Sequence, residues 1–196
     1  IQKEAEQAVR SMAGFSDEEM FSPIIASTKR RAVWLGINLL TAFLGAWVIG
    51  RFEDTIQQLV ALAVLMPVVA GMGGIAGSQT LTIAIRGIAL GQIAKTNVKP
   101  LLIKELSIGI LNGIFWSCVV AIVVILWFGK LSLGVIIGAS MIINLIIAAL
   151  AGATIPIILK RYGIDPAIAG GVILTTVTDV VGFVTFLGLA TIFLLS

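Results

Sequence analysis

Histidine is absent from the 196-residue chain, and cysteine occurs once, at Cys118. Without histidine, no imidazole can serve as a base, a proton relay or a metal ligand. A single cysteine excludes an intramolecular disulfide and a thiolate cluster, and its apolar neighbours indicate a packed thiol rather than a reactive one. Charged residues are also scarce, at 12% of the chain. Together these features exclude a disordered tail, a disulfide scaffold and a nucleic-acid-binding module.

Hydrophobic residues make up 59% of the chain, which exceeds the roughly 45–50% of a soluble domain. A helix needs about 20 mainly apolar residues to cross the hydrocarbon core of a bilayer. Five segments meet this requirement: residues 32–49, 56–85, 101–128, 133–159 and 166–195. We therefore predict an all-α fold, a polytopic membrane bundle of five transmembrane helices. It occupies one membrane domain, residues 29–196, because no hydrophilic stretch between the spans is long enough for a soluble domain.

Basic residues are distributed unevenly between the two ends of the predicted spans. Only Arg51 and Lys130 lie on one side. The other side carries Lys3, Arg10, Lys29, Arg30, Arg31, Arg86, Lys95, Lys99, Lys104, Lys160 and Arg161. Because membrane proteins retain Lys and Arg on the cytoplasmic side, we predict a protein of the plasma membrane with a cytoplasmic N-terminus and an external C-terminus.

Residues 1–28 precede the first predicted span and are polar. Ala5, Ala8, Val9 and Met12 recur at helical spacing, which predicts an amphipathic cytoplasmic helix. Because the chain starts with isoleucine rather than methionine, we expect it to be a fragment or a processed product, with any upstream domain outside this sequence. The helix is then either a lead-in on the membrane surface or a coupling element that transmits force from that domain.

The second span contains an unusual segment that starts at Pro67. Four glycines follow that proline between residues 71 and 77. Proline removes a helical hydrogen bond, and each glycine weakens a helix by about 1 kcal/mol relative to alanine. We therefore predict a bent or locally unwound helix whose freed carbonyls face a cation or its hydration waters in a cavity. The alternative is a kinked helix whose glycines form a face for close packing.

The fifth span carries Asp179 near its midpoint, and we predict this to be the only deeply placed charge. Glu105, early in the third span, is expected to reach the interface or to pair with Lys104 or a neighbouring chain. Aspartate at a helix centre costs roughly 2.5–3.5 kcal/mol on insertion scales, so Asp179 needs a partner, a water-filled cavity or a proton. Helical spacing places Thr175, Thr176 and Gly182 near it. No basic residue lies at that depth, which favours a transient cation as the partner; a protonated carboxyl that serves packing is the alternative.

Oxygen ligands of this kind suit hard cations. Mg²⁺ usually keeps several of its waters and takes one or two carboxylates. One aspartate per chain is few, but a homodimer would present two of them. We therefore expect two copies of the chain to build the site together.

Three stretches of the sequence resemble the membrane domain of the MgtE-type magnesium channels and transporters. They are residues 67–79, the Lys104-Glu105 pair, and the segment from Asp165-Pro166-Ala167 through Thr175-Thr176 to Asp179 and Gly182. The five-span layout agrees, and the resemblance covers residues 20–196. It implies a homodimer with a pore for hydrated Mg²⁺ along the interface, lined by the second and fifth spans.

The resemblance also assigns residues to this pore. Asp179 matches the central pore carboxylate, Gly71 and Gly74 match backbone carbonyl positions, and Thr175 matches another such position. The remaining expected pore-lining residues are Ser78, Gly171, Thr176 and Gly182.

Two positions depart from the family pattern. Ile75 stands where asparagine is common, and Gly171 stands where a polar ligand can occur. Both changes remove polar groups that could contact the waters of a hydrated ion, so they weaken the expectation of strict Mg²⁺ preference. The resemblance also implies an upstream cytoplasmic regulatory domain, with residues 1–20 as the end of its connecting helix.

Our predicted function is a divalent-cation channel or facilitator, with Mg²⁺ as the ion and no cofactor. The membrane potential would drive entry with about 2.3 kcal/mol per elementary charge per 100 mV. A proton- or sodium-coupled transporter that uses Asp179 is the alternative. A further possibility, a packing subunit, would tolerate Asp179→Ala. An enzyme is not expected, because an intramembrane protease needs either two deep aspartates or a histidine.

Overall fold

The computed structural model describes residues 23–93 and 96–194. Over these residues the regular elements are helices: α2 (Ile24–Gly50), α3 (Glu53–Gln58), α4 (Ala61–Ala89), α5 (Val98–Phe128), α6 (Leu131–Arg161) and α7 (Pro166–Leu194). Within this described part, all except α3 are long and apolar enough to cross a membrane, five in total. The predictions of an all-α fold and five spans are thus confirmed. The amphipathic helix predicted within residues 1–20 lies outside the described residues.

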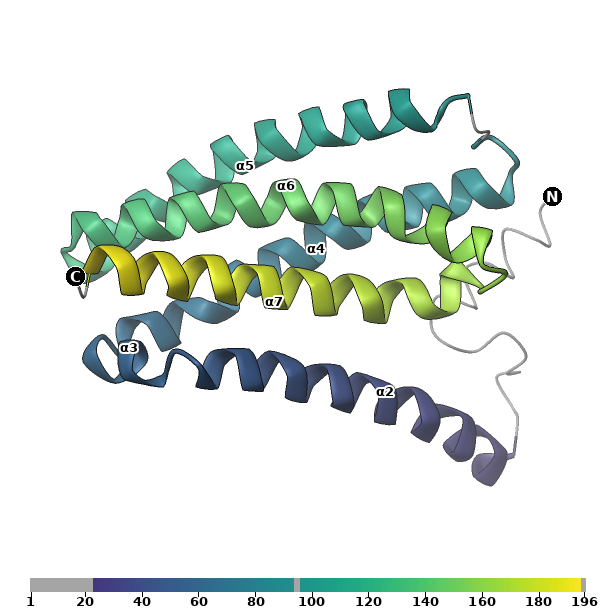
Figure 1. Cartoon of the computed structure of the whole chain (residues 1–196), viewed down its shortest axis with the longest axis horizontal. Helices are drawn as coiled ribbons and strands as arrows, with labels where there is room; N and C mark the ends of the chain where they lie inside the picture. The colour runs from purple at the N-terminus through teal and green to yellow at the C-terminus, as the bar shows by residue number, and fades with distance from the viewer. Residues whose placement is uncertain (1–22, 94–95, 195–196) are drawn as a thin grey trace.

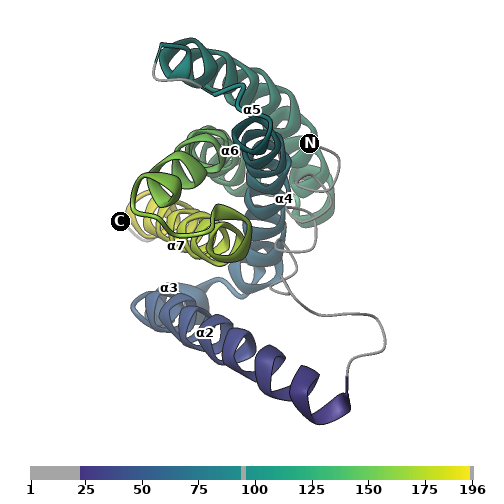
Figure 2. The same ribbon diagram turned by 90° about the vertical axis from the view of Figure 1, so that its right-hand side faces the viewer.

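The long helices lie side by side and alternate in direction (Figure 1). Helix α6 is central and packs against α4, α5 and α7, while α2 lies along α7 (Figure 2). The apolar stretch of α6 is 61% buried within the protein, against 11% for α2. Most of the surface of α2 is therefore exposed on the single chain.

Local signals explain where two of the helices meet their connections. Helix α5 is followed by Gly129, whose left-handed φ of 66° is a conformation that glycine adopts without strain. This allows a tight turn into α6. At the start of α7, a carboxylate oxygen of Asp165 accepts a hydrogen bond from the Ala167 amide at 2.9 Å, with Pro166 between them. This is the arrangement of an acidic cap followed by proline in the first turn.

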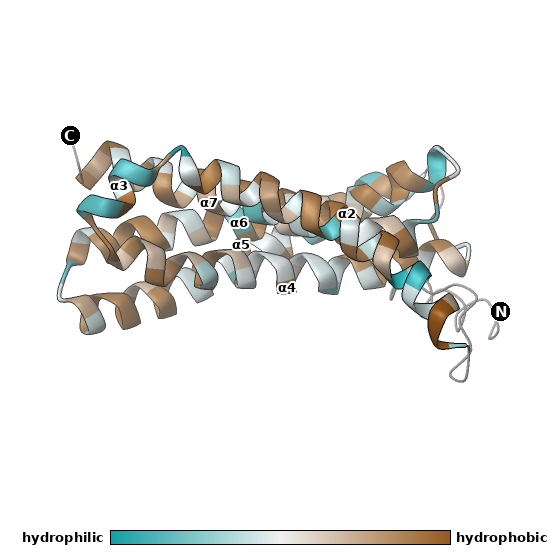
Figure 3. Ribbon diagram, turned by 90° about the horizontal axis from the view of Figure 1, so that it is seen from below, coloured by the Kyte–Doolittle hydropathy of each residue, from teal (hydrophilic) through white to brown (hydrophobic). Residues whose placement is uncertain are grey.

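The alternating helices place most basic residues at one end of the bundle. The helix ends near Lys29, Arg86, Lys99 and Lys160 lie together at the right of Figure 1. Strong hydrophilic colour gathers at helix ends and on α3, while the lengths of the helices are mostly brown or pale (Figure 3). This distribution suits a bundle whose middle lies in hydrocarbon and whose ends lie in water.

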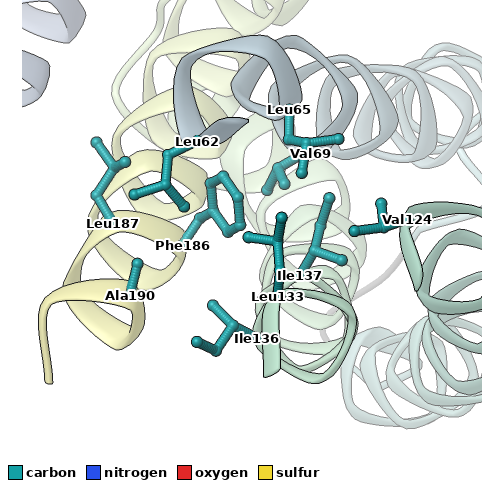
Figure 4. Packing of buried hydrophobic residues seen from close by; sticks show 10 residues of the cluster. All are labelled: Leu62, Leu65, Val69, Val124, Leu133, Ile136, Ile137, Phe186, Leu187 and Ala190. Atoms are coloured by element: carbon teal, nitrogen blue, oxygen red, sulfur yellow. The ribbon is translucent and has the colours of Figure 1, made fainter. Parts of the chain in front are cut away.

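The interior contains two apolar clusters, one in each half of the bundle. In the first, Phe186 of α7 packs between α4 and α6 (Figure 4). Its members are Leu62, Leu65, Val69, Val124, Leu133, Ile136, Ile137, Phe186, Leu187 and Ala190. The second is formed by Leu81, Ile85, Ala151, Ile155, Leu159, Ala167 and Leu174. Along the helices, the level between the two clusters is occupied by glycines and buried polar residues, including Asn144 and Thr178.

The expected unwinding of the second span is wrong. Helix α4 runs without a break from Ala61 to Ala89 and includes Pro67. In hydrocarbon, each unpaired backbone group would cost several kcal/mol, which exceeds the helix penalty of a glycine of about 1 kcal/mol. Gly73 and Gly77 also allow close contact, with Asn144 and with Leu174 respectively. The second span also starts at residue 61 rather than 56, because α3 precedes it.

Candidate cation-binding groove

A groove of about 730 Å³ lies between the middles of α4 and α7. The residues that line it are Ala70, Gly71, Gly74, Ile75, Ser78, Gln79, Thr82, Ile83, Thr175 and Asp179. Asp179 is the one charged side chain in this set. The neutral polar groups beside it are hydroxyls and one amide, which can donate to or accept from water.

Helix α7 contributes Asp179 and, one turn earlier, Thr175. The Thr175 hydroxyl donates within its own helix, to the carbonyl of Gly171 at 2.9 Å or of Val172 at 3.1 Å. Its lone pairs therefore remain free to accept a hydrogen bond. The half-buried carboxylate of Asp179 makes no hydrogen bond or ion pair with any other described residue. A carboxylate in this position can accept a cation or the waters around one.

Helix α4 contributes an opposite wall with little side-chain cover. A Cβ atom built on Gly71 or Gly74 would meet nothing within 4 Å. The Gly74 carbonyl also accepts a hydrogen bond of 2.7 Å from the Ser78 hydroxyl. From the sequence we expected unwinding to free these carbonyls, and it does not. The absence of side chains nevertheless leaves that stretch of backbone uncovered.

The structure brings five of the eight predicted site residues into one groove. These are Asp179, Thr175, Gly71, Gly74 and Ser78.

The other three predicted residues lie outside its lining. Gly171 is exposed in the same helical row as Thr175 and Asp179. The half-buried Thr176 donates to the Val172 carbonyl at 2.7 Å. Gly182 is buried against Asn144.

Sequence reasoning did not assign Gln79 and Thr82 to the site. Both line the groove, and the Thr82 hydroxyl donates to the Ser78 carbonyl at 2.8 Å. An unbroken helix repeats one face every three or four residues, so the row from Gly71 continues through Ser78 to Thr82. This signal was in the sequence, but it is readable only if α4 is taken as continuous.

A second carboxyl, nearer to the end of its helix than Asp179, is buried inside the bundle. Glu105 of α5 is only 3% exposed, and its Oε2 atom accepts a hydrogen bond of 3.0 Å from the Thr80 hydroxyl of α4. The partner of Glu105 in the structure is thus Thr80, which the sequence does not indicate because it lies on another helix.

The groove faces outward on the single chain. Ile75 and Ile83 line it and are 60% and 58% exposed. Ile75, one of the two departures from the family pattern, thus places an apolar side chain in the groove on the α4 side. Two large aliphatic side chains beside a carboxylate make a surface of mixed character, which is unlike the uniformly apolar face that lipid would contact.

The fold and the groove together define a class of protein: a multi-pass helical membrane protein with a carboxylate-bearing groove at the middle of the bundle. The comparisons with known proteins then identify the family. Residues 66–189 match the MgtE family of divalent cation transporters, and the chain belongs to it.

Three relatives, each named magnesium transporter MgtE, are similar over most of the chain. The protein of Bacillus subtilis is 38% identical over 85% of the chain. Those of Enterococcus faecalis and Thermus thermophilus are 30% and 31% identical over 99% and 84% of it. The matches span 37%, 43% and 36% of those relatives, so the chain corresponds to about two fifths of their length. The family is one of transporters, which confirms that an enzyme is not the right class.

Proposed function

We propose that the chain forms a channel or facilitator for divalent cations, with Mg²⁺ as the ion. The observation that carries this proposal is the Asp179 carboxylate, which lies mid-groove without a described partner and opposite the uncovered backbone of Gly71 and Gly74. The family match supplies the ion class. A carboxylate held inside a membrane bundle without a basic partner is stabilised when a cation arrives.

The ion passes with part of its hydration shell. Mg²⁺ gives up water reluctantly and binds through one or two carboxylates. In the groove, the Asp179 carboxylate of each chain binds the ion directly. The waters of the ion are contacted by the hydroxyls of Ser78, Thr82 and Thr175 and by the Gln79 amide. Ile75 supplies no such contact, so the waters are held on fewer sides than a polar residue there would allow.

Two copies of the chain enclose the pore. On one chain the groove is open and offers a single carboxylate. A two-fold arrangement with the grooves facing each other doubles the carboxylates and buries Ile75 and Ile83. A homodimer therefore provides two carboxylates to balance the charge of the ion, and it covers the exposed aliphatic side chains.

The direction of transport follows from the charge distribution. With the basic end of the bundle in the cytoplasm, the protein lies in the plasma membrane with its N-terminus inside. A potential that is negative inside then drives a divalent ion inward with about 4.6 kcal/mol per 100 mV, twice the value for one elementary charge. An upstream cytoplasmic regulatory domain would act through residues 1–20.

A coupled transporter is the second candidate, and one observation favours it. Ion coupling usually employs a second intramembrane acid, and Glu105 is a buried carboxyl. However, its bond to Thr80 lies on the buried side of α4, away from the groove residues Ser78 and Gln79. The two carboxyls therefore face separate environments, and the channel remains the better-supported function.

The test is Mg²⁺ entry into proteoliposomes with an internal magnesium-sensitive dye, under an imposed potential that is negative inside. We expect the unaltered chain to carry Mg²⁺ and Asp179→Asn to lose most of that flux. Asp54→Asn is the matched control, because it removes the same charge from an exposed position on α3. Equal flux through the Asp179→Asn and unaltered proteins would refute the proposal.

Two further measurements complete this test. If neither protein carries Mg²⁺, equilibrium binding decides, since the proposal requires Mg²⁺ to bind the unaltered chain more tightly than Asp179→Asn. Dependence of the flux on a proton or sodium gradient at fixed potential would favour the coupled transporter instead.

A further inference from the structure

The amide of Asn144 occupies the centre of the bundle, behind the groove. Asn144 lies in the middle of α6, and none of its surface is exposed. It contacts Gly73 of α4 and Gly182 of α7, which are both buried between the levels of the two apolar clusters. A polar side chain at this depth is uncommon in membrane helices and usually needs a hydrogen-bond partner.

Two glycines make the space that the amide fills. A Cβ atom on Gly73 would overlap the Asn144 Nδ2 atom and lie 3.1 Å from Oδ1. A Cβ atom on Gly182 would lie 2.9 Å from the same Nδ2 atom and 3.3 Å from Cγ1 of Val69. The amide therefore stands where side chains from α4 and α7 would otherwise meet, and it touches both helices at once.

One end of the amide is bonded, and the other is not. Nδ2 donates a hydrogen bond of 2.9 Å to the Val69 carbonyl of α4, a carbonyl whose second lone pair serves the helix. Oδ1 is buried and has no hydrogen-bond partner among the described residues. Leaving a buried acceptor without a partner is unfavourable, and a leucine of similar shape would avoid that cost. Packing alone thus does not explain asparagine here, whereas the bond to α4 does.

The bonded carbonyl lies next to the groove. Val69 precedes the groove residues Ala70 and Gly71, and Gly182 follows Asp179 by less than one turn of α7. The amide therefore holds α4 and α7 at a set height and separation at the level of the carboxylate. A shift of either helix at this point changes the distance between the Gly71 backbone and Asp179.

We propose that Asn144 is a positioning residue for the cation site. It acts through the Val69 carbonyl and the two glycine contacts, and it fixes the spacing of α4 against α7. That spacing sets the affinity of the groove for Mg²⁺ and its preference for Mg²⁺ over larger divalent ions. This inference rests on the proposed function of the groove.

The test compares Asn144→Leu and Asn144→Ala with the control Ser140→Ala. Ser140 lies one turn earlier on α6 and is also fully buried, but its hydroxyl bonds only to the Ile136 carbonyl of its own helix, at 2.7 Å. For each protein we would measure the thermal midpoint in detergent, the Mg²⁺ dissociation constant, the KM and maximal rate of Mg²⁺ flux, and inhibition of Mg²⁺ flux by Ca²⁺.

The expected result separates positioning from folding. Asn144→Leu should keep its thermal midpoint yet weaken Mg²⁺ affinity by about tenfold, as loss of an outer-shell partner commonly does. Its KM should rise by a similar factor, and Ca²⁺ should compete better. Asn144→Ala should show the same change in KM together with a lower midpoint. Ser140→Ala should leave KM and the Ca²⁺ competition unchanged.

Unaltered KM, dissociation constant and Ca²⁺ competition in folded Asn144→Leu and Asn144→Ala would overturn the inference. Asp179→Asn, measured beside them, separates this failure from a failure of the proposed function. If Asp179→Asn abolishes Mg²⁺ binding and the Asn144 variants bind normally, only the positioning role is wrong. If Asp179→Asn also binds normally, the groove is not the cation site.

Discussion

Gly71→Ala and Gly73→Ala add the same methyl group two residues apart on α4, and we expect opposite effects on stability. A Cβ atom at position 71 would meet nothing within 4 Å. Because alanine is the better helix former by about 1 kcal/mol, Gly71→Ala should leave the free energy of unfolding equal or slightly higher. At position 73 the new methyl would overlap the Asn144 amide.

The expected size of the second effect follows from that overlap. Overpacking a well-filled interior costs about 1–3 kcal/mol. Displacing the Asn144 amide also breaks its bond to the Val69 carbonyl, and a buried polar group left unpaired costs about 1–3 kcal/mol. After the gain in helix propensity of about 1 kcal/mol, Gly73→Ala should lower the free energy of unfolding by about 1–5 kcal/mol.

The assay is reversible unfolding in mixed micelles with increasing dodecyl sulfate, followed by circular dichroism and by tryptophan fluorescence. Mg²⁺ flux provides a second readout. Gly71→Ala should reduce flux although it is stable, because its methyl group covers part of the groove wall. Equal destabilisation by the two substitutions would show that α4 does not present these glycines to different surroundings, and would refute the reasoning.

Two other predictions concern Glu105 and Ile75. Glu105→Gln retains an acceptor for the Thr80 hydroxyl and should unfold like the unaltered protein, whereas Glu105→Ala leaves that hydroxyl unpaired and should lose about 1–3 kcal/mol in the same assay. Equal losses would show that the bond to Thr80 is not what stabilises this contact. Ile75→Asn adds a polar group to the groove at a position that is 60% exposed. It should lower the KM for Mg²⁺ relative to Ca²⁺, because an amide can contact the waters of the ion where isoleucine cannot. An unchanged ratio in flux competition would count against contact between residue 75 and the hydrated ion.

Most of the architecture could be predicted without the structure, because crossing a bilayer imposes a length and a composition on each segment. The five long helices overlap the predicted spans, and their ends differ by a few residues. The largest difference is at the first span, where α2 starts at Ile24, eight residues before the predicted start. At the second span, α3 occupies residues that we had given to the membrane helix. Polar residues such as Glu53, Asp54 and Gln57 mark that short helix in the sequence, but its length is below what a periodic pattern resolves.

The candidate site was predicted less completely than the fold. The depth of Asp179 is a local property of α7, and its place in the groove agrees with that depth. The surroundings of a glycine, by contrast, cannot be predicted from the residue itself, because it has no side chain whose polarity indicates them. Gly71 faces open space and Gly73 packs on Asn144, although both lie in one short segment.

The sequence by itself determined the number of spans, the clustering of basic residues at one end and the depth of the acidic residue in the fifth span, because each depends on residues close together in the chain. Only the tertiary structure decided which face of α4 turns toward Asp179, that Glu105 meets Thr80, and that Asn144 bonds to Val69. Each of these depends on a partner from another helix. Steric fit and hydrogen bonding between helices choose that partner, since between lipid-embedded helices the hydrophobic effect no longer discriminates.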